Sequence, residues 1–302
     1  MNIAIIGTGG IGGYYGARLA HGGHDVHFLL NTEYEYVRDN GLIVDSYLGN
    51  FSLENPLVYN DINDMPKCDM ICICVKATKN AEIFPMIAPI IKADSNIILL
   101  QNGIGYEEEL LRLYPDTHIF GGMCFISSFR EGQGYIKHTA YGKITIASLN
   151  EEDTERLEEV KNLFEIVGIE VETTTDLALG RWKKLVWNMP YNGLTVIADC
   201  STDKLAASKP MRKLAKAIME EVMGAAEACG VEITPSFIEA MIESTDNIGA
   251  YNPSMRLDFL AKRPMEIDTI YGNPIKLAES SGYDMKYCKM IKWQLENIQA
   301  EY

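Results

Sequence analysis

The sequence predicts an α/β fold, in which a doubly wound sheet forms the N-terminal part of the chain and helices alone form the C-terminal part. Short apolar stretches alternate with helical stretches through the first half, which is typical of a doubly wound sheet. Beyond Gly168 one extended piece, residues 170–174, is followed by apolar residues at helical spacing to the end. We therefore expect two domains, residues 1–172 and 173–302.

Composition and charge narrow the classes of partner. The 302 residues are 47% hydrophobic and 23% charged, as in ordinary globular proteins. The formal net charge of −15 argues against nucleic acid or an anionic membrane surface, because both attract basic patches. A small anionic ligand remains compatible with this charge, since a few local cations suffice to hold it.

The N-terminus and the cysteines predict a cytoplasmic protein. The apolar run Ile3–Ile6 ends at Gly7 and has no basic segment before it, unlike a secretory signal. No window approaches the roughly 18 apolar residues of a membrane helix. The seven cysteines are odd in number and form no CxxC pair, so we expect reduced thiols and no metal site.

The first thirty residues predict a strand, a glycine-rich turn, a helix and a second strand. Residues 2–6 and 26–30 are the strands, and a helical stretch extends to about His21. The turn between them has the spacing GxGxxG, in which glycines allow a tight turn, close approach of a pyrophosphate, and close helix–strand packing. We therefore predict a Rossmann-type dinucleotide site, with the helix N-terminus binding the phosphates. Its residues are Gly7, Thr8, Gly9, Gly10, Ile11 and Gly12.

Two residues bear on which dinucleotide binds. An NAD site usually has an acid at the end of the second strand, and an NADP site has a cation nearby. This chain has the uncharged Asn31 there, which decides nothing, while Lys76 follows the apolar stretch 70–75. The interpretation of Lys76 as a solvated lysine at a strand end stays open. The missing acid and the presence of Lys76 favour NADP, with NAD as the alternative.

Further elements continue the sheet and then give way to helices. We predict strands at 96–100, 119–125 and 143–147, and helices at 81–92, 106–114, 266–281 and 285–300. A further helix is predicted with Ser208 as its cap, Pro210 in its first turn and Gly230 just past its end. The turn Gln101-Asn102-Gly103 follows one of these strands, and ligands of such sheets bind at the carboxyl ends of strands. Asn102 is thus a candidate to contact the cofactor or the substrate, unless it serves the turn geometry alone.

A predicted helix that begins near Asp176 contains an unusual polar stripe. Lys184, Asn188 and Asn192 are four residues apart and share one face, while tryptophan and leucine occupy the others. Pro190 removes one backbone hydrogen bond, so we expect a kink there. A partly buried lysine among amides can donate a proton or hold an anion. A solvated lysine is the alternative.

Together, these motifs resemble those of the ketopantoate reductase (2-dehydropantoate 2-reductase) family. The resemblance spans most of the chain, and it depends on the order and spacing of several short motifs. They are GxGxxG at 7–12, VKA at 75–77, QNG at 101–103, WKKLVWN at 182–188, SM at 254–255 and EID at 266–268.

The resemblance implies an NADPH-linked reduction of 2-dehydropantoate to (R)-pantoate, a step of pantothenate biosynthesis. It implies that Lys184 is the general acid and Glu266 its partner carboxylate. The substrate-binding positions that it implies are Asn102, Asn188, Asn192 and Ser254. The chemistry agrees independently, because hydride addition to a ketone leaves an alkoxide that a positioned ammonium neutralises.

Two departures from the family pattern and two alternatives remain. Pro190 is unusual within the helix that carries Lys184. Many family members have an arginine just after the second strand, where Asn31 stands here. A reductase of another branched or aromatic 2-oxo acid, using NADH, is the first alternative. A non-catalytic dinucleotide-binding sensor is the second. The apolar stripes of the helical part fit either a homodimer interface or the chain's own core.

Overall fold

The computed structural model describes residues 1–150 and 152–302. The chain divides into two compact units. Unit 1 comprises Met1–Gln101 and Gly105–Leu177, and unit 2 comprises Asn102–Ile104 and Ala178–Tyr302. The short loop 102–104 thus belongs to the helical unit, although the strand before it belongs to the sheet.

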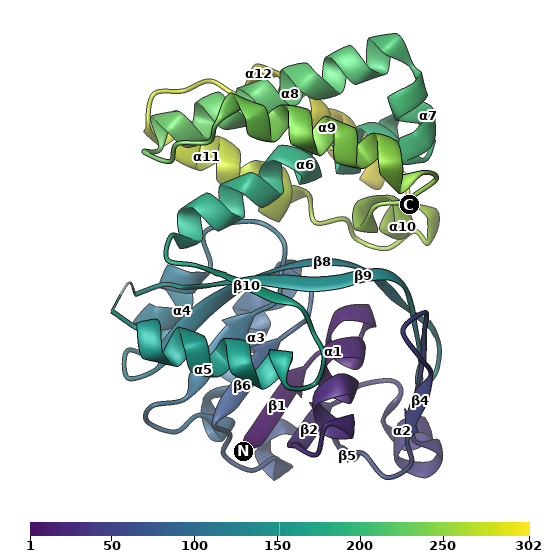
Figure 1. Cartoon of the computed structure of the whole chain (residues 1–302), viewed down its shortest axis with the longest axis vertical. Coiled ribbons are helices and arrows are strands. Elements are labelled where there is room, and N and C mark those ends of the chain that lie inside the picture. Colours follow the sequence, from purple (N-terminus) through teal and green to yellow (C-terminus); the bar gives the residue numbers. More distant parts are fainter. Residues whose placement is uncertain (151) are drawn as a thin grey trace. The chain divides into compact units, whose positions relative to one another are not determined.

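The described residues of unit 1 form one mixed sheet of ten strands (Figure 1). Their order is β4-β3-β9-β8-β7-β6-β1-β2-β5, with β10 paired to β9. Strands β5, β2, β1, β6, β7 and β8 are parallel to one another, and β8 and β9 form a long antiparallel hairpin. The strands are β1 (Asn2–Ile6), β2 (Asp25–Leu29), β3 (Leu42–Ser46), β4 (Phe51–Leu53), β5 (Leu57–Tyr59), β6 (Met70–Ile73), β7 (Asn96–Leu99), β8 (His118–Gly132), β9 (Tyr135–Ser148) and β10 (Val171–Thr174).

Helices cover both faces of this sheet because successive strand residues point to opposite sides. Ile3 and Ile5 of β1 pack in one core with α1 and α5, whereas Ala4 and Ile6 pack in a second core with α3 and α4. The helices of unit 1 are α1 (Gly10–His21), α2 (Tyr34–Asn40), α3 (Asn80–Met86), α4 (Glu107–Leu113) and α5 (Thr154–Glu165), with 3₁₀ turns η1 (Ile62–Asp64), η2 (Ala77–Lys79) and η3 (Ala88–Ile90).

The regular elements in the described residues of unit 2 are all helices, and they share a single core that includes α6 (Figure 1). Trp182, Leu185 and Met189 of α6 are fully buried there. The other elements are α7 (Thr202–Ala207), α8 (Lys209–Ala228), α9 (Pro235–Ile248), α10 (Ser254–Leu260), the π-helical segment η4 (Asp268–Gly272), α11 (Asn273–Ser280) and α12 (Lys286–Gln299), and α6 itself spans Leu177–Ile197. The predicted fold class is confirmed.

Several predicted elements differ from the structure in extent. The strands predicted at 119–125 and 143–147 are the inner parts of one hairpin that extends through 118–148. The helix predicted at 81–92 ends at Met86, one residue after Pro85, and a 3₁₀ turn follows. The helix predicted at 266–281 consists of a π-helical segment and then α11. Helix α6 continues through Pro190, so the proline does not end it.

Candidate active site

The glycine-rich turn connects β1 to α1 in unit 1. Gly7 has φ of +99°, which favours glycine, and Gly12 approaches the turn so closely that an added Cβ would lie 2.1 Å from the Gly7 carbonyl oxygen. At Gly9, by contrast, an added Cβ would meet no atom within 4 Å. The backbone at Gly9 therefore faces open space at the N-terminus of α1, where helix N–H groups have no partner within the helix. This geometry fits a bound pyrophosphate.

The other predicted cofactor residues of unit 1 lie on the same edge of the sheet as this turn. Strands β1, β2 and β6 are parallel, so their carboxyl ends share one edge. The Thr8 hydroxyl donates a hydrogen bond to the Leu29 carbonyl, 3.4 Å away, at the end of β2. Asn31 is exposed just beyond that point, and Lys76 follows β6 with its Nζ buried.

A pair of side-chain amides fixes the loop that follows β7. Gln101 Nε2 donates to the Val75 carbonyl at 2.8 Å and to Asn80 Oδ1 at 2.7 Å, and Asn80 Nδ2 donates to Gln101 Oε1 at 3.1 Å. Gly103, with φ of +96°, then lets the chain turn after Asn102. Asn80 was not predicted as a functional residue, because its partner Gln101 is 21 residues away in the chain and follows a different strand.

A polar cluster forms around Asn102 in unit 2. Asn102 Nδ2 donates to Glu266 Oε2 at 3.5 Å, and Asn188 Nδ2 donates to Asn102 Oδ1 at 3.4 Å. Asn188 and Glu266 are 4% and 6% exposed. Both bonds are long, as catalytic hydrogen bonds often are before a ligand binds. Lys184 is half-buried on α6, one helical turn before Asn188.

Asn192 is also buried, and its amide oxygen has a partner within the protein. Asn192 Oδ1 accepts a hydrogen bond from the backbone N–H of Met255 at 3.1 Å. Met255 is in the first turn of α10, whose own N-cap residue, Pro253, provides no side-chain cap. Asn192 therefore caps α10 from a distance and fixes the position of Ser254, the exposed first residue of that helix.

Arg256 supports the same helix and was not among the residues predicted from the sequence. Its Nη1 donates to the Thr195 carbonyl at 2.7 Å and pairs with Asp199 Oδ1 at 3.0 Å, while Nε donates to Asn252 Oδ1 at 3.0 Å. Arg256 is only 8% exposed. The sequence feature that could have pointed to Arg256 is a charged residue between two apolar ones, Met255 and Leu257. These bonds hold α10 against the C-terminal end of α6.

Glu266 lies two residues before the π-helical segment η4. The Thr269 hydroxyl donates to the Glu266 carbonyl at 3.1 Å, and the Tyr271 hydroxyl donates to the Met189 carbonyl of α6. The π-helical turn is thus docked on α6, which holds Glu266 near Asn188 and Asn102. Short π-helical turns are rare and frequently occur at functional sites.

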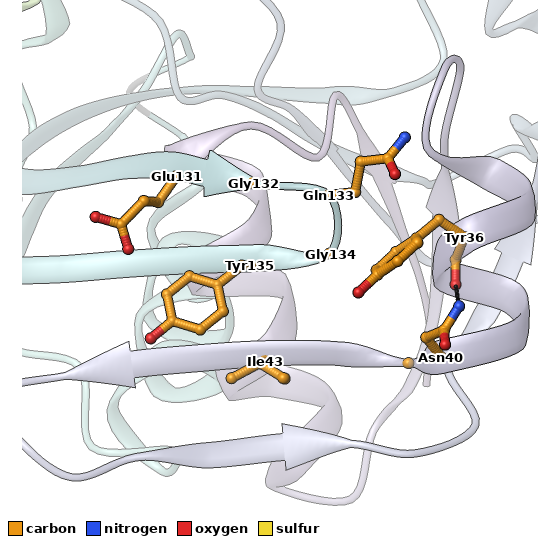
Figure 2. A pocket seen from close by; sticks show the side chains of 9 residues that line it. Tyr36, Asn40, Ile43, Glu131, Gly132, Gln133, Gly134 and Tyr135 are labelled. Atoms are coloured by element: carbon orange, nitrogen blue, oxygen red, sulfur yellow. Dashed lines mark hydrogen bonds between the residues drawn. The ribbon is translucent and has the colours of Figure 1, made fainter.

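A separate hollow of about 420 Å³ lies in unit 1, at the tip of the β8–β9 hairpin (Figure 2). Its lining comes from α2, β3 and the hairpin, and includes Tyr36, Tyr135 and Glu131. Asn40 Nδ2 donates to the Tyr36 carbonyl at its edge, at 2.9 Å. The lining includes no cation, so the hollow does not suit a phosphate group.

Potential metal ligands and cysteines are located throughout the described residues. Within residues 1–150 and 152–302, no group of three or more histidine, cysteine or acidic side chains is arranged to hold a metal ion. The seven cysteines are free thiols, and burial raises the pKa of Cys72 and Cys74 well above its usual range. In the same described part of the chain, none of the helices has the length and apolar character needed to span a membrane.

The fold and site together define an oxidoreductase that uses a nicotinamide dinucleotide. Comparison with known families makes this more specific. Residues 3–151 match the family described as ketopantoate reductase PanE/ApbA, and residues 176–299 match its C-terminal family. The chain belongs to the ketopantoate reductase family, which confirms the resemblance found in the sequence.

Individual relatives agree with this assignment. The chain is 42% identical over 298 residues to a 2-dehydropantoate 2-reductase of Nostoc sp., covering 97% of this chain and 93% of that one. It is similar to the crystal structure of a 2-dehydropantoate 2-reductase from Geobacter metallireducens, with a TM-score of 0.95, 36% identity, and coverage of 98% and 99%. A D-mandelate dehydrogenase with NADH and anilino(oxo)acetate shares the fold, with a TM-score of 0.90 at 21% identity and coverage of 100% and 99%.

Proposed function

We propose that this protein reduces 2-dehydropantoate to (R)-pantoate with NADPH. The single observation that supports this most directly is the partly buried Asn188–Asn102–Glu266 chain of amide and carboxylate groups, one helical turn from Lys184. The 42% identity with the Nostoc enzyme, which extends over nearly the whole chain, supports the same substrate.

The dinucleotide binds to unit 1 in this proposal. The N–H groups at the start of α1 hold its pyrophosphate, and the open space at Gly9 admits the phosphate oxygens to the backbone. The bound nicotinamide supplies a hydride to the carbonyl carbon of the substrate. Gly7, Thr8, Gly10, Ile11 and Gly12 shape the turn, and Asn102 lies at the carboxyl end of β7, where it can also contact the cofactor.

The substrate is held by polar residues of unit 2. Amides at Asn102 and Asn188 and the hydroxyl of Ser254 bind its polar atoms without adding charge. Glu266 accepts hydrogen bonds from substrate hydroxyls or from the lysine. The ammonium of Lys184 donates a proton to the oxygen that becomes negatively charged as the carbonyl is reduced, which contributes roughly 10²- to 10⁴-fold to the rate.

Lys76 follows β6, whose carboxyl end lies on the same edge of the sheet as that of β1, and a cation on this cofactor-binding edge favours NADPH over NADH. A second candidate function is the reduction of another branched or aromatic 2-oxo acid with NADH. The uncharged Asn31 and the fold shared with a D-mandelate dehydrogenase that binds NADH favour this alternative.

A panel of 2-oxo acids assayed with both NADPH and NADH tests the proposal. We expect 2-dehydropantoate with NADPH to give the highest kcat/KM. A higher value for an aromatic 2-oxo acid with NADH would replace the proposal with the second candidate. Dinucleotide binding without turnover of any 2-oxo acid would indicate a sensor instead.

The role of Lys184 is tested by Lys184→Ala, with Lys183→Ala as the matched control. Lys183 is the adjacent residue on α6, and its Nζ lies 5.5 Å from the centre of the Phe237 ring. We expect Lys184→Ala to lower kcat by roughly 10²- to 10⁴-fold with dinucleotide affinity unchanged, and Lys183→Ala to keep near-normal kcat. A Lys184→Ala enzyme with normal turnover would exclude the proposed role.

A further inference from the structure

The β8–β9 hairpin runs directly alongside the glycine-rich turn of unit 1. The Ser128 hydroxyl donates to the Gly10 carbonyl at 2.9 Å. An added Cβ at Gly10 would lie 2.3 Å from the Ser128 carbonyl oxygen and 2.8 Å from Phe129 Cα. Only glycine at position 10 leaves room for the hairpin to pack this closely. Residues 128–129 are therefore held against the proposed phosphate-binding turn.

The next residue of the hairpin, Arg130, reaches the segment that follows β2. Arg130 Nη1 lies 3.1 Å from Glu33 Oε1. The hairpin register shifts between Ser127 and Ser128 and again between Arg130 and Gly132, and such irregularities redirect side chains. The Glu33 side chain is 7% exposed, whereas that of Arg130 is 46% exposed. The buried carboxylate therefore holds a guanidinium that remains accessible to a ligand.

This location is where dinucleotide-binding proteins distinguish NADP from NAD. Glu33 immediately precedes α2, four residues after the end of β2, and the Thr8 hydroxyl connects the glycine turn to that strand end. A side chain near the end of the second strand contacts the adenosine ribose, with an acid for the 2′-hydroxyl and a cation for the 2′-phosphate. Asn31 provides neither charge, so the Arg130–Glu33 pair brings both charges to this segment.

We propose that Arg130 binds the ribose 2′-phosphate of NADP, and that Glu33 positions the Arg130 guanidinium. The planar guanidinium suits bidentate binding of phosphate oxygens on its exposed side, while the buried Glu33 carboxylate holds it from the other side. This inference rests on the proposed dinucleotide-dependent function.

Binding measurements without any 2-oxo acid test this assignment. Isothermal titration calorimetry compares NADP+ with NAD+, and 2′,5′-ADP with 5′-AMP, so that each pair differs only in the 2′-phosphate. We expect Arg130→Gln to raise Kd for NADP+ and 2′,5′-ADP by roughly 10- to 100-fold, with Kd for NAD+ and 5′-AMP changed by no more than about twofold. Arg130→Lys should recover part of the affinity, because it keeps the charge but not the bidentate geometry.

Arg156→Gln is the matched control. Arg156 pairs with Asp94, which precedes β7 and so lies toward the amino ends of the parallel strands, away from the glycine turn. We expect this variant to bind all four ligands like the wild type. Loss of 2′-phosphate affinity in Arg156→Gln equal to that in Arg130→Gln would overturn the assignment, because general charge would then explain both.

The Arg130→Gln protein could fail to fold, because the buried Glu33 carboxylate then lacks its cation. The double variant Arg130→Gln/Glu33→Gln removes both charges and keeps the test valid in that case. It should fold and should discriminate poorly between 2′,5′-ADP and 5′-AMP. Undiminished affinity for NADP+ in either folded variant overturns the assignment, as does equal weakening of NADP+ and NAD+, which would indicate that Arg130 only shapes the site. Discrimination that depends on Arg130 in a protein that turns over no 2-oxo acid would refute the proposed function and leave this assignment standing.

Discussion

Alanine substitutions at Gly9 and Gly12, in the same turn, should affect different properties of the protein: dinucleotide affinity at Gly9 and stability at Gly12. Gly9 has φ of −84° and ψ of −156°, which any L-residue can adopt, and an added Cβ there meets no atom within 4 Å. At Gly12 the added Cβ would lie 2.1 Å from the Gly7 carbonyl oxygen and 2.9 Å from Ile5 Cγ2. Alanine therefore fits at the first position and clashes at the second.

The two substitutions should change different quantities. Gly9→Ala should leave the free energy of unfolding unchanged or raise it by about 0.4–1 kcal/mol, because alanine restricts the unfolded chain. It should weaken NADP+ binding by roughly tenfold or more, since the methyl group occupies the space through which the backbone approaches the phosphates. Gly12→Ala should lower the free energy of unfolding by about 1–3 kcal/mol, because a backbone carbonyl cannot move away as a flexible side chain can.

Urea unfolding followed by circular dichroism gives the free energy of unfolding, and calorimetric titration gives the Kd for NADP+. Each variant is the control for the other, since both place the same methyl group in the same turn. Wild-type affinity in Gly9→Ala would refute the assignment of this turn to the pyrophosphate. Wild-type stability in Gly12→Ala would refute the packing argument.

Two further predictions concern stability. Burial lowers the pKa of His27, whose Nδ1 lies 3.0 Å from the Tyr59 hydroxyl oxygen. The neutral His27 side chain therefore contributes its full stability above the ordinary pKa of about 6.5. This contribution is lost as the pH falls through the lower pKa of the folded protein. His27→Phe should reduce the loss of stability between about pH 7.5 and about pH 5 in urea titrations, and an unchanged loss would contradict this. Asn192→Leu leaves the Met255 N–H without its acceptor and should lower the free energy of unfolding by about 1–3 kcal/mol. The control Asn247→Leu, on the exposed face of α9, should lower it by less than about 0.5 kcal/mol. Equal losses in urea unfolding would argue against capping of α10 by Asn192.

The candidate site combines features that a sequence reveals to different degrees. The alignment of Lys184, Asn188 and Asn192 follows from helix geometry alone, because residues four apart share a face. Their partners do not follow from it. Asn102 and Glu266 are 164 residues apart in the chain, and only the tertiary packing of unit 2 brings their side chains together. The roles of these residues in catalysis remain predictions.

The sequence by itself determined the strand–turn–helix–strand beginning, the change from sheet to helices, and the family. Those features depend on local periodicity, on glycine spacing and on the order of motifs. The tertiary structure alone decided the extent of the β8–β9 hairpin, the capping of α10 by Asn192, and the pairing of Arg130 with Glu33. Each of these joins segments distant in the chain, so the contact depends on how whole elements pack, and a local pattern of residue types does not encode it.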